Sequence, residues 1–136
     1  MAIVRKEIDI DAAPDHVWAA VRDFGAVHER VAPGFLTGLQ MDGDARIVTF
    51  ANGMVAREVL IGIDDDDRRI AYRIADERMA HHSASVRIVA NANGGSRFVW
   101  ITDVLPHEAA EVVGAMMEQG AQAAKRTLER QPARPA

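Results

Sequence analysis

The stretch HEAAEVVGAMMEQGAQAAKRTLER, residues 107–130, decides how the rest of the chain is arranged. It contains no proline and is rich in helix-forming residues, so it predicts an α-helix about 36 Å long at ~1.5 Å per residue. Its first turns are acidic and its last turns basic, which suits the helix dipole. Small and apolar residues recur at steps of three and four along one face, namely Ala109, Val113, Met116, Met117, Gly120, Ala124 and Leu128. That face must be buried against something, and the upstream sequence offers a series of strand patterns.

Seven upstream segments have the pattern of β-strands, and turn signals such as Asp42-Gly43-Asp44 and Asn52-Gly53 separate the later ones. The first segment alternates between apolar and charged residues, which is typical of a half-buried strand. The expected strands are Ile3–Asp11, Phe35–Met41, Ala45–Phe50, Met54–Ile63, Arg69–Ile74, Ser83–Ala90 and Ser96–Leu105. Short connections between them predict an antiparallel sheet.

Two short helices are expected between the first and second strands. Pro14, with Asp11 and Asp15 beside it, marks the start of one helix, and Gly25 ends it. Its expected buried side consists of Val17, Trp18, Val21 and Phe24. A second helical piece is expected over residues 27–31. The order of elements therefore predicts an α+β fold, in which a curved seven-stranded antiparallel sheet wraps around the long terminal helix.

The terminal helix is thin where it faces the sheet, because Gly120, Ala121, Ala123 and Ala124 carry little or no side chain. A curved sheet cannot fill its concave side with one layer of side chains. We therefore expect a hollow between the sheet and this helix, and hollows of this kind bind apolar molecules.

Composition argues against several classes of protein. The 136 residues predict one domain over 1–130, followed by a disordered tail over 131–136. With 16 basic and 20 acidic residues the formal net charge is −4, which does not favour nucleic-acid binding. The absence of cysteine excludes disulfides and cysteine-ligated metals. The charged start is unlike a signal peptide and no apolar run approaches the ~18 residues of a membrane span, so a cytoplasmic protein is expected.

Three stretches of the chain resemble the START/Bet v1-like helix-grip superfamily, which includes polyketide cyclase/dehydrase-like proteins. They are Ala13–Trp18 after the first strand, the segment from Arg57 to Ile74, and Gly94–Trp100 ahead of the terminal helix. The resemblance implies the helix-grip fold and a ligand cavity between the sheet and the last helix. It implies no universal set of catalytic residues, because the superfamily includes binders, carriers and enzymes.

The middle third also looks distantly like the plant abscisic acid receptors of this superfamily. Arg46 and Glu58 match positions where those receptors carry inward polar side chains. The turn Ala51–Gly53 is short where the receptors have a longer gating loop, and Asp76–Met79 lacks their latch pattern. Hormone reception is therefore not implied.

The register of the Asn52-Gly53 hairpin decides which strand face lines the cavity, because a slip of one residue reverses every side chain. A three-residue turn over 51–53, with a left-handed glycine, sets Arg46 opposite Glu58. A two-residue turn sets Arg46 opposite Val59 instead. We choose the three-residue turn, because it agrees with the family's inward Glu58 and places a buried charge beside its opposite.

With this register, one face of the sheet and one side of the helix enclose the ligand. The predicted ligand-binding residues are Arg46, Val48, Phe50, Glu58, Leu60, Tyr72, His82, Phe98, Trp100, Met116, Met117 and Gly120. The rest of the predicted cavity face consists of Ala56, Ile74, Ala84, Val86, Thr102 and Val113. The opposite face of the long strand, with Val55, Val59, Ile61 and Ile63, is also apolar and suggests a homodimer contact or imperfect alternation.

Arg46 and Glu58 are predicted either to anchor the polar end of a ligand or to form an internal salt bridge that holds strand register. Tyr72 and His82 are the candidate catalytic residues, as a hydrogen-bond donor or a general acid and base; otherwise they are a core tyrosine and a rim histidine. His81 and His82 cannot bind one ion together, because adjacent strand residues point to opposite faces. No metal site and no cofactor is expected.

Three hypotheses follow. The first is a protein that binds a small, mostly hydrophobic molecule such as a lipid. The second is an enzyme of the cyclase/dehydrase type, in which the same residues place a polyketone and Tyr72 or His82 moves protons. The third is an interaction module without a ligand. Shifted acid–base groups inside the cavity favour the second hypothesis, and a collapsed cavity favours the third.

Overall fold

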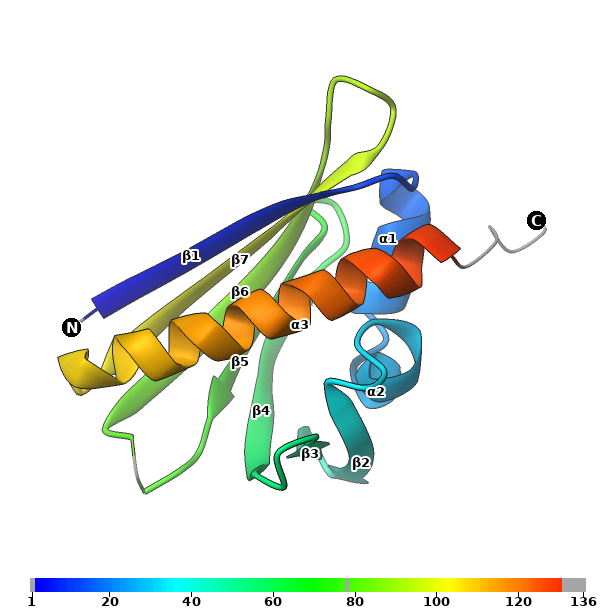
Figure 1. Ribbon diagram of the computed structural model, residues 1–136. Coiled ribbons are helices and arrows are strands. Elements are labelled where there is room, and N and C mark those ends of the chain that lie inside the picture. Colours follow the sequence, from blue (N-terminus) through cyan, green and yellow to red (C-terminus); the bar gives the residue numbers. More distant parts are fainter. Residues whose placement is uncertain (1, 78, 131–136) are drawn as a thin grey trace.

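A curved antiparallel sheet with a long helix laid across it forms the framework of the protein (Figure 1). The computed structural model describes residues 2–77 and 79–130. In this part of the chain the strands follow the order β1-β7-β6-β5-β4-β3-β2. The strands are β1 (Ala2–Ile10), β2 (Leu36–Asp42), β3 (Ala45–Phe50), β4 (Val55–Asp64), β5 (Arg69–Ile74), β6 (His81–Ala90) and β7 (Ser96–Leu105). The predicted α+β fold with a seven-stranded sheet is confirmed, and the expected tail over 131–136 lies outside the described residues.

The helices differ from the expectation mainly at their ends. They are α1 (Pro14–Val21), α2 (Val27–Arg30) and α3 (Ala110–Arg130), with 3₁₀ turns η1 (Phe24–Ala26) and η2 (His107–Ala109). The prediction that α1 continues to Gly25 is wrong, because the chain turns after Val21 and re-forms as η1. The long helix begins as the 3₁₀ turn η2 and becomes α-helical at Ala110, which is common at helix starts. Figure 1 shows α1 and α2 at one end of the sheet.

Strand β6 begins at His81, two residues before the predicted start at Ser83. The pairing explains the difference: β7 is continuous to Leu105, and His81 lies opposite Leu105 in the ladder. A long neighbouring strand therefore extends a polar segment whose own sequence is not typical of a strand.

The β3–β4 hairpin has the predicted three-residue turn. Phe50 donates its backbone N–H to the carbonyl of Met54 at 2.8 Å, which leaves residues 51–53 in the turn. Gly53 has a φ of +89°, the left-handed conformation that glycine adopts without strain. Arg46 lies opposite Glu58, so the chosen register is confirmed.

A β-bulge in β4 changes the outer face of the sheet. The register with β5 shifts between Leu60 and Gly62, so side chains beyond this point swap faces. Ile61 points outward and is exposed, whereas Ile63 packs against the main core. The prediction that Ile63 lies on the outer face is therefore wrong, and Val55 and Ile61 remain as its exposed apolar residues.

The core is divided along α3. The second half of the helix, with Ala123, Ala124 and Leu128, packs into a large cluster with α1 and the sheet. The first half, with Val113 and Met117, packs into a separate cluster with Ala2 and Val104. Helix α3 is thus held firmly at both ends, and the space between the two clusters is where a hollow can persist.

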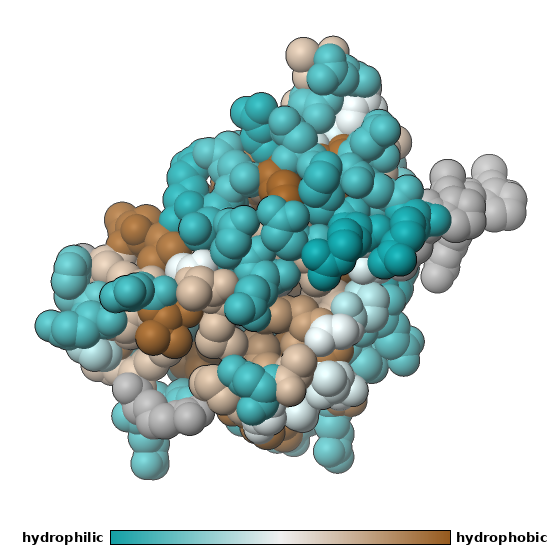
Figure 2. All heavy atoms as spheres, in the orientation of Figure 1, coloured by the Kyte–Doolittle hydropathy of each residue, from teal (hydrophilic) through white to brown (hydrophobic). Residues whose placement is uncertain are grey.

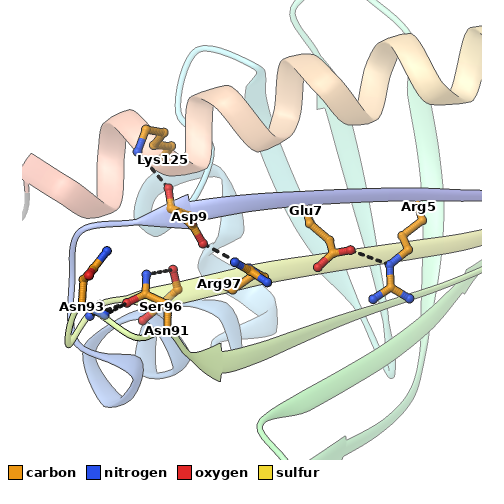
Figure 3. A network of polar contacts seen from close by, with 9 residues as sticks. Arg5, Glu7, Asp9, Asn91, Asn93, Ser96, Arg97 and Lys125 are labelled. Atoms are coloured by element: carbon orange, nitrogen blue, oxygen red, sulfur yellow. Dashed lines mark hydrogen bonds and ion pairs between the residues drawn. The ribbon is translucent and has the colours of Figure 1, made fainter.

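Polar contacts around the start of β7 fix β1 and α3 to each other (Figure 3). Lys125 of α3 donates to the backbone carbonyl of Asp9 at 2.8 Å, and the Asp9 carboxylate accepts from Arg97 Nε at 3.1 Å. In the β6–β7 turn, the side-chain oxygen of Asn91 accepts the backbone N–H groups of Asn93 and Gly95. The Lys125 bond therefore joins the last half of α3 to the end of β1.

Candidate functional site

A cavity of about 140 Å³ lies between the concave face of the sheet and α3. Its lining is mostly apolar, and the space-filling view shows a hollowed, largely apolar area below α3 on the face turned to the viewer (Figure 2). The hypothesis that the cavity is collapsed, which favoured an interaction module without a ligand, has no support in this geometry.

Most of the predicted ligand-binding residues do lie around this cavity. From the sheet and the helix, the structure brings together Arg46, Phe50, Glu58, Tyr72, His82, Phe98, Trp100, Met116, Met117 and Gly120. Ala56, Ile74, Val86, Thr102 and Val113 of the predicted face also line it.

Val48, Leu60 and Ala84 share the inward face but do not reach the cavity. Val48 is fully buried in a separate cluster with Leu36 and Ala56, and Leu60 packs against the main core beside the β4 bulge. Ala84 is buried in the same main cluster, and its short side chain stays below the surface of the lining. The alternation of side chains along a strand predicts correctly which face these residues lie on. It does not predict which of them are covered by neighbouring side chains and so kept out of the cavity.

Several lining residues were missed by the sequence analysis. They are Val21, Val27, Val31, Ala32, Phe35, Leu36, Met54, Ile70, Asp76 and Met79. Many come from α1, α2 and the segment before β2, which close one end of the cavity. The apolar pattern of these segments indicates burial, but the pattern does not say against what they are buried.

Arg46 and Glu58 form a buried ion pair on the wall of the cavity. Arg46 Nε donates to Glu58 Oε1 at 2.7 Å, and the two residues are 5% and 6% exposed. A second guanidinium nitrogen of Arg46 donates to the backbone carbonyl of Phe24 at 3.0 Å. The guanidinium carbon also lies 4.0 Å from the ring centre of Phe24 and 5.0 Å from that of Tyr72, within cation–π range. This arginine is therefore bonded to its surroundings on several sides.

Tyr72 stays protonated in this site. Burial, and next the negative charge of Glu58, raise the pKa of its hydroxyl far above the ordinary value. The positive charge of Arg46, and next the indole of Trp100, act on this pKa in the opposite direction. Tyr72 can consequently donate a hydrogen bond, but it cannot act as a base near neutral pH.

Burial lowers the pKa of His82 below its ordinary value and so favours the neutral imidazole, while the charge of Glu58 and a hydrogen bond to the residue's own backbone act in the opposite direction. His82 is 9% exposed, whereas its neighbour His81 is exposed on the other face, as predicted. Its Nδ1 has no hydrogen-bond partner among the described protein atoms. The same holds for Trp100 Nε1 and for Thr102 Oγ1, so three buried polar atoms of the lining residues are unpartnered.

Trp100 lies against Gly120 of α3. A methyl group at Gly120 would meet ring atoms of Trp100 at 2.9 Å and of Phe35 at 3.0 Å, which is too close for an unshifted contact. Glycine at this position lets both rings approach the helix axis, and these rings form part of the lining.

Within residues 2–77 and 79–130, no group of three or more histidine, aspartate or glutamate side chains is placed to hold a metal ion. In the same part of the chain, no helix is long and apolar enough to cross a membrane.

A family described as "Polyketide cyclase / dehydrase and lipid transport" matches residues 1–129 of the sequence. No curated protein sequence matches the chain significantly.

Solved structures match the whole fold at low sequence identity. The protein XoxI from Bacillus cereus superposes with a TM-score of 0.85 at 16% identity, covering 96% of this chain and 97% of that one. A START superfamily protein from Mycobacterium smegmatis gives 0.70 at 13% identity, with 93% and 94% covered. The di-domain ARO/CYC protein BexL of the BE-7585A biosynthetic pathway gives 0.75 at 14% identity, with 95% of this chain and 47% of that chain covered. At such identities these likenesses establish the fold alone.

Proposed function

The chain belongs to the polyketide cyclase/dehydrase and lipid transport family, and from that premise we propose that it binds a small, mostly hydrophobic molecule between the sheet and α3. The observation that carries the proposal is a cavity of about 140 Å³ with a largely apolar lining. Binding sites for small molecules are typically apolar hollows with a few placed polar groups.

The size of the cavity limits the ligand. An apolar cavity of about 150 Å³ holds a molecule the size of benzene. A single ring with a short substituent therefore fits the cavity as it stands. Longer molecules, such as a lipid chain or a polyketone, require the lining to widen, and the thioethers of Met54, Met79 and Met116 suit such movement.

Two adjacent residues of α3 provide a matched test. Val113 is buried and lines the cavity, whereas Val112 is 62% exposed. Val113→Phe fills part of the hollow, so we expect it to weaken binding of an apolar probe such as α-methylstyrene at least tenfold, whereas Val112→Phe leaves binding unchanged. Binding is followed by NMR titration, and circular dichroism checks that both variants fold, because overpacking costs about 1–3 kcal/mol.

Native mass spectrometry of the purified wild-type protein complements this titration by searching for a molecule that co-purifies. The proposal fails if no molecule co-purifies and no apolar probe binds, or if both phenylalanine variants bind the probe as the wild type does.

The alternative is an enzyme of the cyclase/dehydrase type that acts on a polyketone in the same cavity. It is favoured by the presence of Tyr72 and His82 on one lining, both with shifted pKa values. The direction of the shifts weakens this alternative, because burial makes Tyr72 a weaker acid and His82 a weaker base. A poly-β-ketone substrate that the wild type cyclises and Tyr72→Phe does not would establish the enzyme over the binder.

The proposed partner is a small molecule, and the proposal places the protein in the cytoplasm without a nucleic-acid partner. A homodimer across the outer face of β4, where Val55 and Ile61 are exposed, stays a prediction. Light scattering of the wild type and of Ile61→Ser tests it independently of ligand binding.

A further inference from the structure

The outer face of the sheet, which is turned away from α3 (Figure 1), carries an open hollow. Small side chains form the middle of the hollow and larger ones its two sides, namely Ala71, Ser83 and Ser85 between Ile61 and Ile101. Ile61 is 58% exposed, and Ile3 at the edge of the same face is 71% exposed. Exposed apolar residues that gather on one face often mark a contact with another protein.

Two opposite charges lie on either side of β6, the strand in the middle of the hollow. The pairing of the strands sets Arg73 of β5 beside Ser83 of β6, and Ser83 beside Asp103 of β7. All three point outward, because the residue before each of them on its strand lines the cavity. Strands lie about 4.8 Å apart, so the Cα atoms of Arg73 and Asp103 are roughly 10 Å apart. Neither side chain has an ion-pair partner within residues 2–77 and 79–130.

Other arginines of the outer face differ from Arg73 in their surroundings. Arg87 and Arg5 each form an ion pair with an acidic residue nearby, at 2.6 Å and 2.8 Å. Arg69, at the edge of the hollow, has no ion pair in the described part of the chain, but the residues level with it on β6 and β7 are not acidic. Around the hollow, Arg73 and Asp103 are therefore the opposite charges that lie in one row of the sheet and lack partners among the described residues.

A second copy of the chain supplies both missing partners when the two outer faces pack against each other. A twofold axis that runs along β6, between the two sheets, reverses the order of the strands and keeps the position of each residue along its strand. Strand β5 then faces the partner's β7, so Arg73 faces the partner's Asp103, and the symmetry repeats this contact in reverse. Packed sheets lie about 10 Å apart, a gap that an arginine and an aspartate side chain span together.

The same axis also matches the apolar side chains. In the neighbouring row, Ala71 of β5 pairs with Ser85, and Ser85 pairs with Ile101 of β7. Ala71 therefore faces the partner's Ile101, so that a large side chain enters the space above a small one. At the two ends of the charged row lie Val59 of β4 and Ile3 of β1, which the axis also brings face to face. Charge and shape thus agree on one arrangement.

We infer that two copies of this chain associate through the outer faces of their sheets, with β6 on the twofold axis and Arg73 of each copy bonded to the partner's Asp103. The inference makes the homodimer prediction specific and moves the centre of the contact from β4 to β6. A lipid surface or a nucleic acid attracts charge of one sign, whereas this face presents both signs. The contact does not depend on a ligand, because the cavity lies on the other side of the sheet.

Charge reversal tests the pairing. Arg73→Asp and Asp103→Arg each place like charges opposite one another in both symmetric contacts, which opposes association. In an equimolar mixture of the two variants, a mixed dimer has opposite charges at both contacts again, because one copy carries two acids and the other two arginines. Arg126→Asp is the control, since it makes the same change of charge at an exposed position of α3. Sedimentation equilibrium of the full-length proteins measures the dissociation constant of the dimer, and circular dichroism checks that each variant folds.

We expect the wild type to form dimers and each single reversal to raise the dissociation constant at least tenfold. The mixture of the two reversed variants should return to within about threefold of the wild-type dissociation constant, because both ion pairs form again. The Arg126→Asp variant should associate as the wild type does.

A wild type that sediments as a monomer, even at the concentrations of NMR samples, overturns the inference. A dimer that either single reversal leaves unchanged also overturns it, because the contact then lies on another surface. The inference fails as well if the two reversed variants stay monomeric when they are mixed. The proposed function is judged separately, since α-methylstyrene should bind both reversed variants as it binds the wild type.

Discussion

Two walls of the same cavity differ in whether their buried polar groups have hydrogen-bond partners. On the β3–β4 wall, Arg46 and Glu58 are bonded to each other at 2.7 Å, and Arg46 is also held by Phe24. On the β6–β7 wall, Trp100, Thr102 and His82 each carry a buried polar atom that has no hydrogen-bond partner among the described residues. Arg46 and one oxygen of Glu58 thus have partners within the protein, whereas the three atoms on β6 and β7 have none among the described residues.

This difference separates a structural role from a binding role. A buried charge pair that is bonded within the protein contributes to strand register. Buried polar atoms without a hydrogen bond lower the stability of the protein. The comparison therefore supports a structural role for Arg46 and Glu58.

The largest effect on stability is expected on the β3–β4 wall. Glu58→Gln removes the charge that balances Arg46 and leaves a buried guanidinium without its counter-ion. Breaking a buried pair in this way costs about 3–5 kcal/mol, so we expect a loss of this size in the free energy of unfolding. Urea unfolding followed by circular dichroism measures it.

An exposed pair on the same sheet is the control. Arg5 Nε lies 2.8 Å from Glu7 Oε2, at 56% and 38% side-chain exposure, and exposed pairs contribute about 0–1 kcal/mol. We expect Glu7→Gln to change stability by no more than this. If Glu58→Gln lowers the free energy of unfolding as little as Glu7→Gln does, the buried pair does not have the structural role argued above.

A smaller effect on stability, of opposite sign, is expected on the β6–β7 wall. Thr102→Val exchanges an unpartnered hydroxyl for a methyl group of the same shape, and burying an unbonded hydroxyl costs about 1–3 kcal/mol. We therefore expect the ligand-free variant to be more stable than the wild type by about 1–2 kcal/mol in urea unfolding.

The exposed residue Thr37 on β2 provides the control, because Thr37→Val changes no buried group and should stay within about 0.5 kcal/mol of the wild type. If Thr102→Val is less stable than the wild type, the hydroxyl must have a bonding partner within the protein, and the contrast between the walls disappears.

The fold was predictable because its signals are local. Alternation in the strands, the Asn52-Gly53 turn and the long amphipathic helix each specify an element, and short connections leave few ways to arrange them. The errors lie where neighbours override local pattern. The bulge at Gly62 turns Ile63 inward, and the long partner β7 extends β6 back to His81.

For the site, the sequence predicts only which face of the sheet lines the cavity. Parity and the chosen register identify Arg46, Glu58 and Tyr72 as inward, but they do not say that Phe24 and Tyr72 enclose the guanidinium. Which inward residues meet the hollow depends on packing at a distance in sequence. Helix α3 lies against Trp100 at Gly120, while the α1–α2 segment covers one end of the cavity, and neither contact has a signal in the strand pattern.

The smallest effect concerns His82 and is a dependence of stability on pH. Because burial lowers the pKa of His82 in the folded protein, the unfolded chain binds a proton more readily, and the free energy of unfolding falls as pH drops through about 6.5, the ordinary histidine pKa. The slope that one proton causes is at most about 1.4 kcal/mol per pH unit. Glu58 opposes this effect and His81 adds to it.

Urea unfolding between about pH 5 and pH 8 measures this slope, and His82→Gln should reduce it because glutamine does not titrate in that range. His81→Gln alters the adjacent, exposed residue and should leave most of the slope in place. If the two variants reduce the slope equally, His82 is not held neutral by burial.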